Sequence, residues 1–251
     1  MDAVLESFQD DVFIITLNRP DRKNAMNTDL LVGLLKSLEK AQKERAKVVV
    51  IRGSGKAFCA GGDLVEFRES QDPGARIDAM ADTLHKSIKK IREIDAIVIS
   101  VIEGVAVGAG IGLALACDLT IATKSSIMNM GYRRIGLTPD GGGSIFLPRL
   151  MGAKRFNEFY LLSRNIDMNE AKELGFINFI YEEEELEAKL LSLIQNLKSL
   201  PMETIGRFKD LVNNSCYFGL DIHLDKEKQY VSELATDPLF KERLNAFFSK
   251  R

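Results

Sequence analysis

Residues 96–117 read AIVISVIEGVAVGAGIGLALAC, and this stretch decides the fold. A β-branched run at 97–102 comes first, and a segment that contains four glycines follows it. With Glu103 as its one charge, the stretch is long enough for a membrane span. A buried strand, a glycine-rich turn and a small-residue helix explain it better, because the β-branched residues stop where the glycines begin. We therefore predict no membrane span.

Similar runs on both sides of this stretch predict further strands. They lie at residues 12–17, 47–52, 119–122, 127–130 and 177–181. Helical patterns lie between them, one with leucines at 30–38 and Asn27 or Thr28 as its N-cap. Strands that alternate with helices predict an α/β domain with a parallel sheet.

The pattern changes near residue 182, after which only helical periodicity remains. We therefore expect a core domain at residues 1–182 and a helical C-terminal region at residues 183–251. The sequence leaves open whether this region packs on its own core or on another subunit.

Composition excludes several classes of protein. The 34 Lys and Arg residues and 36 Asp and Glu residues give a net charge of −2, which argues against a nucleic-acid binder. The cysteines, Cys59, Cys117 and Cys216, are too widely spaced for a disulfide framework or a zinc motif. No signal peptide is visible at the N-terminus, so we expect a cytoplasmic chain in a reducing compartment.

Two glycine-rich segments follow predicted strands. In the first, residues 56–64, Gly61 and Gly62 let backbone N–H groups approach a ligand, while Asp63 is interpreted as the cap of a helix at 64–69. The second, residues 103–113, fails the G-x-G-x-x-G spacing of a dinucleotide site. It predicts a turn into a helix whose first N–H groups are free, which suits a developing oxyanion or a phosphate.

A third segment, residues 135–144, places Asp140 between a proline and three glycines. Asp140 either caps the following helix or takes part in a site where a ligand comes close, and the residues alone favour neither. His85 and His223 have no visible partners, so we interpret both as packing or surface residues. Glu103, at the end of a strand, is expected to be hydrogen-bonded.

Together these segments resemble one family. Residues 14–27, 57–64, 104–118 and 136–149 occur in the order and spacing of the crotonase superfamily, the enoyl-CoA hydratases and isomerases. The resemblance implies a spiral of β-β-α repeats with a helical C-terminal region that builds trimers and often hexamers. It also implies an acyl-CoA substrate, whose thioester enolate is stabilised, and a place in fatty-acid metabolism.

The resemblance assigns roles to individual positions. The backbone N–H groups of Gly62 and Ala109 would form an oxyanion hole. The adenine end of coenzyme A would be held by backbone groups of four residues, with a lysine near the phosphates: Ala25, Ala60, Asp63, Leu64 and Lys23. Coenzyme A arrives as part of the substrate, so we expect no separate cofactor and no metal.

The chain departs from the hydratases at two positions. The two glutamates of that mechanism would fall at Gly112, which has no side chain, and at Tyr132, whose ordinary pKa is about 10. Asp140 instead resembles the single carboxylate of family isomerases. We expect burial among apolar groups to raise its pKa from about 3.9 towards the neutral range, so that it can shuttle one proton.

The sequence thus favours an acyl-CoA isomerase that converts a 3-enoyl-CoA to a 2-enoyl-CoA. The alternatives are an enoyl-CoA hydratase, a lyase, that uses Asp140 with water and is aided by Tyr132, and a CoA-thioester binding protein without catalysis. The same oxyanion hole also supports other reactions, dehalogenation among them. Six residues are candidates for the acyl pocket, although they would serve equally as core: Met80, Leu84, Met128, Met130, Tyr132 and Phe146.

Overall fold

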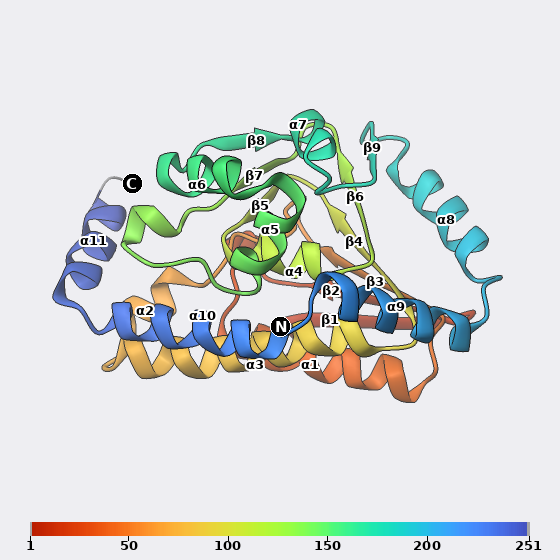
Figure 1. Ribbon diagram of the computed structural model, residues 1–251, viewed down its shortest axis with the longest axis horizontal. Helices are drawn as coiled ribbons and strands as arrows, with labels where there is room; N and C mark the ends of the chain where they lie inside the picture. Colours follow the sequence, from red (N-terminus) through yellow and green to blue (C-terminus); the bar gives the residue numbers. More distant parts are fainter. Residues whose placement is uncertain (1, 250–251) are drawn as a thin grey trace.

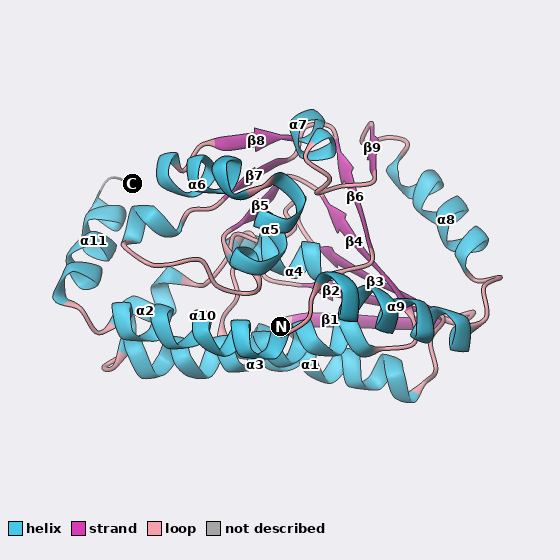
Figure 2. Ribbon diagram, viewed as in Figure 1, coloured by secondary structure: helices cyan, strands magenta, loops and turns pink. Residues whose placement is uncertain are grey.

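The computed structural model describes residues 2–249 (Figure 1). Six strands form the large sheet, in the spatial order β1 (Val4–Gln9), β2 (Val12–Leu17), β3 (Val48–Gly53), β4 (Ile97–Ile102), β6 (Leu119–Thr123) and β9 (Phe179–Tyr181). Only the β1–β2 pair is antiparallel. A smaller sheet contains β5 (Val105–Val107), β7 (Ile127–Asn129) and β8 (Asn165–Asp167), and Figure 2 shows the two sheets as separate groups of strands.

Helices cover the sheets and make up the C-terminal region. Those of the first part of the chain are α1 (Thr28–Lys43), α2 (Leu64–Glu69), α3 (Pro73–Glu93), α4 (Ala109–Ala116), α5 (Gly143–Met151), α6 (Ala153–Leu162) and α7 (Met168–Glu173). The last four are α8 (Leu186–Leu197), α9 (Met202–Cys216), α10 (Leu220–Ala235) and α11 (Pro238–Ser249). Two short 3-10 helices are η1 (Pro20–Arg22) and η2 (Tyr132–Ile135).

The order of these elements confirms the expected spiral. After β4 the chain enters β5 of the small sheet and then α4, and after β6 it enters β7 and reaches α5 through η2. The stretch that resembled a membrane span is therefore β4, β5 and α4. Within residues 2–249, no helix is both long enough and apolar enough to cross a membrane.

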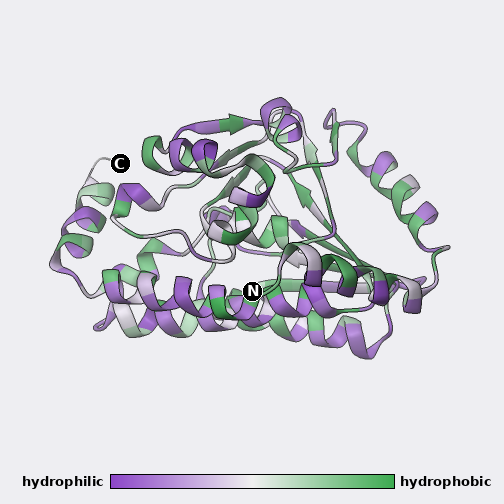
Figure 3. Ribbon diagram, viewed as in Figure 1, coloured by the Kyte–Doolittle hydropathy of each residue, from purple (hydrophilic) through white to green (hydrophobic). Residues whose placement is uncertain are grey.

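Burial explains why the central strands are continuously apolar. All six residues of β4 are buried, as are five of the six in β3, because both faces of the parallel sheet are covered. One face packs against α1, α3 and α4, and the other packs against α8 and α9. In Figure 3 the central strands are accordingly green, whereas the outer helices carry much purple.

The helical C-terminal region folds back on its own core. Helix α10 runs along α3, as Figure 1 shows for the blue and yellow helices, and α11 contacts η2 and α2. This answers the question that the sequence left open about the packing of these helices within one chain. The boundary at residue 182 stays a prediction.

The local predictions agree with the structure where the signal was strong. The six predicted strands are present as β2, β3, β4, β6, β7 and β9, and Asn27 caps α1 by accepting a hydrogen bond from the Leu30 N–H. Strands β1, β5 and β8 were not predicted. Strand β1 is largely exposed, and β5 and β8 have three residues each, too few for a clear periodic pattern.

Candidate active site

The loop before α2 presents a backbone N–H group. Met26 N–H donates to the Gly61 carbonyl at 2.7 Å, and Asp63 N–H donates to the Met26 carbonyl at 2.9 Å. This bridge leaves the N–H of the intervening Gly62 pointing away from Met26. A Cβ at Gly62 would lie 2.7 Å from Cζ of Phe67, so glycine leaves room for this ring.

A second N–H group comes from the first turn of α4. This helix begins at Ala109, whose N–H has no partner within the helix because it belongs to the first turn. Gly108 precedes it with φ +54°, a conformation that glycine adopts without strain. Gly62 and Ala109 line the same cavity, about 420 Å³ in volume, as expected for the two donors of an oxyanion hole.

Asp140 lies in this cavity and is held by a histidine. Its Oδ1 is 2.7 Å from Nε2 of His85, which projects from α3, and both residues are buried. The interpretation of His85 as a packing residue is therefore wrong. The expected apolar surrounding of Asp140 is wrong as well, because the imidazole contacts the carboxylate directly.

The interpretation of Asp140 as a helix cap is also wrong. Helix α5 has Gly142 as its N-cap and shows no side-chain capping bond, so the Asp140 carboxylate remains available to the cavity. Tyr132 donates its hydroxyl to the Asp140 backbone carbonyl at 2.9 Å. Burial first, and then the charges of Asp140 and Glu227, raise the pKa of Tyr132 well above 10.0, so Tyr132 is a neutral donor.

Glu227 is a site residue that the sequence did not reveal. It lies on α10 and is buried, and its carboxylate accepts hydrogen bonds from Gly142 N–H at 2.7 Å and from Ser144 N–H at 2.8 Å. The Ser144 hydroxyl donates to it as well, and also contacts the half-exposed His223. No local pattern marks Glu227, because it is one acidic residue in a helix rich in charges.

The pKa shifts follow from this arrangement. Burial alone lowers the pKa of His85, but the hydrogen bond and charge of Asp140, together with the charge of Glu227, outweigh it and raise the pKa above 6.5. Burial, and then the charge of Asp140, raise the pKa of Glu227 to about 7 against the effect of its hydrogen bonds. The charges of His85, Asp140 and Glu227 therefore act on one another, since their ligand atoms lie within 4.8 Å.

These three residues are also the candidate metal ligands among residues 2–249. Their ligand atoms lie within 4.8 Å of one another. Each already has a protein partner, since His85 Nε2 bonds Asp140, and Glu227 accepts three hydrogen bonds. The donor set is thus arranged for proton chemistry, and we assign no metal to it.

The position expected for a hydratase glutamate is closed. A Cβ on Gly112 would lie 1.8 Å from the Gly141 carbonyl oxygen, a backbone atom that cannot move aside. Helix α4 therefore packs directly against the glycine turn that follows Asp140. Any side chain at residue 112 would displace this turn, so a carboxylate does not fit there in this backbone.

The positions assigned to coenzyme A divide into two groups. Lys23, Ala60 and Leu64 line the cavity. Ala25 and Asp63 do not: the Ala25 carbonyl accepts from the Arg19 guanidinium, which also pairs with the Asp63 carboxylate at 2.8 Å.

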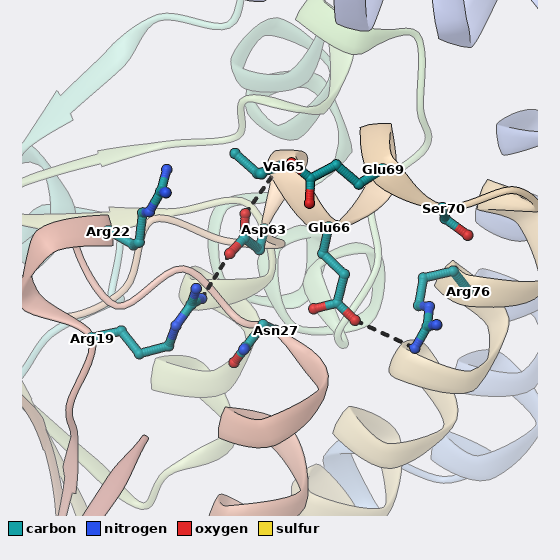
Figure 4. Close-up of a pocket in the computed structure, with 9 residues that line it drawn as sticks. All are labelled: Arg19, Arg22, Asn27, Asp63, Val65, Glu66, Glu69, Ser70 and Arg76. Atoms are coloured by element: carbon teal, nitrogen blue, oxygen red, sulfur yellow. Dashed lines mark hydrogen bonds and ion pairs between the residues drawn. The ribbon is translucent and has the colours of Figure 1, made fainter. Parts of the chain in front are cut away.

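Asp63 faces a separate polar pocket, drawn in Figure 4. Its other oxygen caps α2 by accepting from Val65 N–H, which confirms the structural role predicted for its side chain. Across this pocket Arg76 pairs with Glu66 at 3.5 Å.

Of the candidates for the acyl pocket, Met130 and Tyr132 line the cavity. Met128 and Phe146 are completely buried in the core, where the Phe146 ring packs edge-on against Tyr217 at 5.1 Å between centroids. The apolar wall of the cavity instead includes Phe67 and Ile77 from α2 and α3, and Val231 from α10.

Glu103 is hydrogen-bonded, as the sequence predicted. Its carboxylate pairs with the Arg52 guanidinium at 3.1 Å.

Comparison with known proteins identifies the family. A family model described as enoyl-CoA hydratase/isomerase matches residues 7–251. The chain belongs to the enoyl-CoA hydratase/isomerase family. Within this family it is 30% identical over 257 residues to the 1,2-epoxyphenylacetyl-CoA isomerase of Escherichia coli, covering 100% of this chain and 97% of that protein.

Other members of the family carry other activities in their names. The chain is 30% identical to the 4-chlorobenzoyl coenzyme A dehalogenase-2 of Arthrobacter sp, with 96% of this chain and 88% of that protein covered. The crystal structure of an enoyl-CoA hydratase from Mycobacterium avium subsp. paratuberculosis superposes with a TM-score of 0.90 at 29% identity, covering 99% and 96% of the two chains. Membership therefore gives the family and its acyl-CoA chemistry, and the reaction has to be argued from the residues.

Proposed function

We propose that this family member is an acyl-CoA isomerase that converts a 3-enoyl-CoA to the conjugated 2-enoyl-CoA. One observation carries the proposal: Asp140 faces a cavity lined by Gly62 and Ala109, while the position of a second carboxylate is closed at Gly112. A hydratase of the two-glutamate type needs both carboxylates. An internal proton shift needs only one group that removes a proton and returns it.

In the proposed mechanism, the Asp140 carboxylate removes the proton from C2 of the substrate. The electrons of this C–H bond move into the thioester, and the N–H groups of Gly62 and Ala109 stabilise the resulting dienolate oxygen. Asp140 then returns the same proton to C4, which shifts the double bond into conjugation with the carbonyl. His85, bonded to Asp140 at 2.7 Å, fixes the orientation of the carboxylate.

We further propose that coenzyme A enters only as part of the substrate, with Lys23, Ala60 and Leu64 along its path. The family resemblance implies a homo-oligomer, trimeric or hexameric, and the exposed apolar side chains of the C-terminal region support an interface there. Phe208, Leu211, Phe218 and Ile222 are between 57% and 83% exposed. Light scattering on the purified protein tests this, and a monomer at micromolar concentration would contradict it.

The experiment that tests the reaction follows ultraviolet absorbance with two substrates in separate cuvettes. With a 3-enoyl-CoA the absorbance of the conjugated thioester should grow, and with a 2-enoyl-CoA it should not fall rapidly. Rapid loss with the 2-enoyl-CoA would show a hydratase and overturn the argument from Gly112. No change with either substrate would overturn isomerisation of simple enoyl groups, and binding of a CoA ester would then separate an unusual acyl group from a protein without catalysis.

A further inference from the structure

Glu227 is a buried carboxylate without a permanent cationic partner. Among residues 2–249, no Lys or Arg side chain lies within ion-pair distance of it, and the nearest basic atom is Nε2 of His223 at 3.8 Å. It comes from α10, far along the chain from the acid–base pair that it approaches. Burial of a charged carboxylate lowers the stability of the folded protein unless hydrogen bonds or an opposite charge compensate for the lost water. Its three hydrogen bonds compensate part of this cost, and they also hold the turn that follows Asp140.

The negative charge of Glu227 raises the pKa of His85. The ligand atoms of His85, Asp140 and Glu227 lie within 4.8 Å of one another, and the charges of both carboxylates favour the protonated imidazole. Nδ1 of His85 is buried with no hydrogen-bond partner among the described residues. The charge state of His85 is therefore set by the charges around it rather than by a second hydrogen bond.

Other charged and titratable groups around the site do not replace Glu227. Lys228, the next residue on α10, opposes protonation of His85 but is paired with Asp82 of α3 at 3.2 Å. Lys86, beside His85 on α3, pairs with the same Asp82 at 2.7 Å. From η2, Tyr132 contacts only the backbone of Asp140 through its neutral hydroxyl. In the cluster of His85, Asp140 and Glu227, the carboxylate of Glu227 is thus the one that lies within 4.8 Å of His85 in addition to that of Asp140.

The catalytic cycle makes this second carboxylate necessary. When Asp140 takes the proton from C2 of the substrate, it becomes neutral and no longer balances the charge of His85. A buried imidazolium would then have lost its partner, which is strongly unfavourable. Glu227 can supply the missing negative charge without moving.

We propose that Glu227 is a positioning residue of the acid–base site, the standing counter-charge that keeps His85 protonated while Asp140 alternates between its charged and neutral forms. The inference rests on the proposed function, because it requires Asp140 to carry the proton. The pKa shifts agree with it. The charge of Asp140 is one cause of the raised pKa of Glu227, so protonation of Asp140 lowers that pKa and favours the Glu227 carboxylate when His85 needs it.

The test uses the fact that the chain has two histidines. An NMR titration follows both imidazoles in the purified protein, and His223→Gln assigns them. In the wild type we expect His85 to titrate above 6.5. Glu227→Gln should lower this midpoint by about one unit or more, the effect of losing an opposite charge at this distance. The matched control is Glu233→Gln, which removes an exposed carboxylate from the same helix and should leave the midpoint unchanged.

Asp140→Asn sharpens the test, because the amide imitates the neutral form of Asp140. In this background Glu227→Gln should lower the His85 midpoint by at least as much as in the wild type. A wild-type midpoint below 6.5 would overturn the proposal without any variant, so the test survives if Glu227→Gln does not fold. Equal midpoints in Glu227→Gln and Glu233→Gln would also overturn it.

Kinetics provide the second readout. With a 3-enoyl-CoA at neutral pH, Glu227→Gln should lower kcat by about tenfold, matching one pKa unit, and leave KM nearly unchanged. Glu227→Asp, which keeps the charge, should recover most of the loss. A lower midpoint with an unchanged kcat would overturn the positioning role. If the wild type does not isomerise at all, the proposed function fails, and the NMR titration still decides whether Glu227 holds the His85 proton.

Discussion

The two sides of the cavity are built in different ways. The proposed oxyanion side uses backbone N–H groups of Gly62 and Ala109, each fixed by a short turn next to a helix. The proposed acid–base side presents Asp140 of a loop to the cavity, and His85 of α3 and Glu227 of α10 lie close to Asp140. Backbone donors carry no charge that titrates, whereas the acid–base side contains a histidine and a glutamate whose pKa values are both raised. The oxyanion side therefore responds to changes of shape, and the acid–base side responds to changes of charge.

The largest effect is expected from Asp140→Asn. Loss of a general acid–base group lowers the rate by about 10²–10⁴-fold. Isomerisation of a 3-enoyl-CoA, followed by absorbance, should show this loss while the melting temperature stays close to that of the wild type. Asp10→Asn, an exposed control with left-handed backbone that Asn tolerates, should keep full activity. Full activity in Asp140→Asn would remove Asp140 from the mechanism.

Gly62→Ala tests the oxyanion side by shape alone. The new methyl group would lie 2.7 Å from the Phe67 ring, so the ring and the Gly62 loop must move apart, and we expect this movement to displace the Gly62 N–H group. Loss of one such donor lowers kcat by about 10²–10³-fold. Gly143→Ala is the matched control, since its Cβ meets no atom closer than 3.8 Å. If Gly62→Ala and Gly143→Ala have the same kcat, the Gly62 N–H group does not stabilise the oxyanion.

His85→Gln removes the imidazole from Asp140. A hydrogen bond to a charged group contributes about 1.5–3 kcal/mol, so kcat should fall by about 10- to 100-fold, less than in Asp140→Asn. The pH dependence of kcat between pH 5 and 8 should also weaken, because the imidazole that changes its charge beside Asp140 is missing. A kcat as low as that of Asp140→Asn would indicate that His85 itself transfers the proton.

The smallest effect concerns stability. The folded-state pKa of Glu227, about 7, lies above its ordinary value of 4.5, so the folded protein binds this proton more tightly and loses stability as pH rises from 4.5 to 7. The raised pKa of His85 acts in the same direction, its stabilisation being lost as pH rises above 6.5.

Glu227→Gln should therefore flatten the fall of melting temperature between pH 5 and 8, at about 2–4 °C for each kcal/mol. Burial lowers the pKa of His223, so this residue makes the protein more stable, not less, as pH rises. The control Glu233→Gln keeps both His223 and Glu227, so it shows how steeply the melting temperature falls with pH when both groups are present. Parallel slopes in Glu227→Gln and Glu233→Gln would contradict the assignment.

The sequence by itself determined the parts of the molecule that depend on neighbouring residues. The β-branched run at 97–102, the small residues of α4 and the caps Asn27 and Asp63 specify their elements through contacts a few residues apart. The glycines around Gly62 and the exposed first turn at Ala109 are local in the same sense. For this reason both turns could be predicted without a structure, whereas the role of their N–H groups as an oxyanion hole was assigned by family resemblance and stays a prediction.

Only the tertiary structure decided the acid–base side. His85 and Asp140 are 55 residues apart and Gly142 and Glu227 are 85 apart, so their contacts exist only once α3 and α10 pack together. An amphipathic helix shows which face is buried, but not which polar side chain on that face meets a partner. Phe146 gives an apolar example. Its apolar character predicted burial, but only the packing placed it in the core rather than in the cavity.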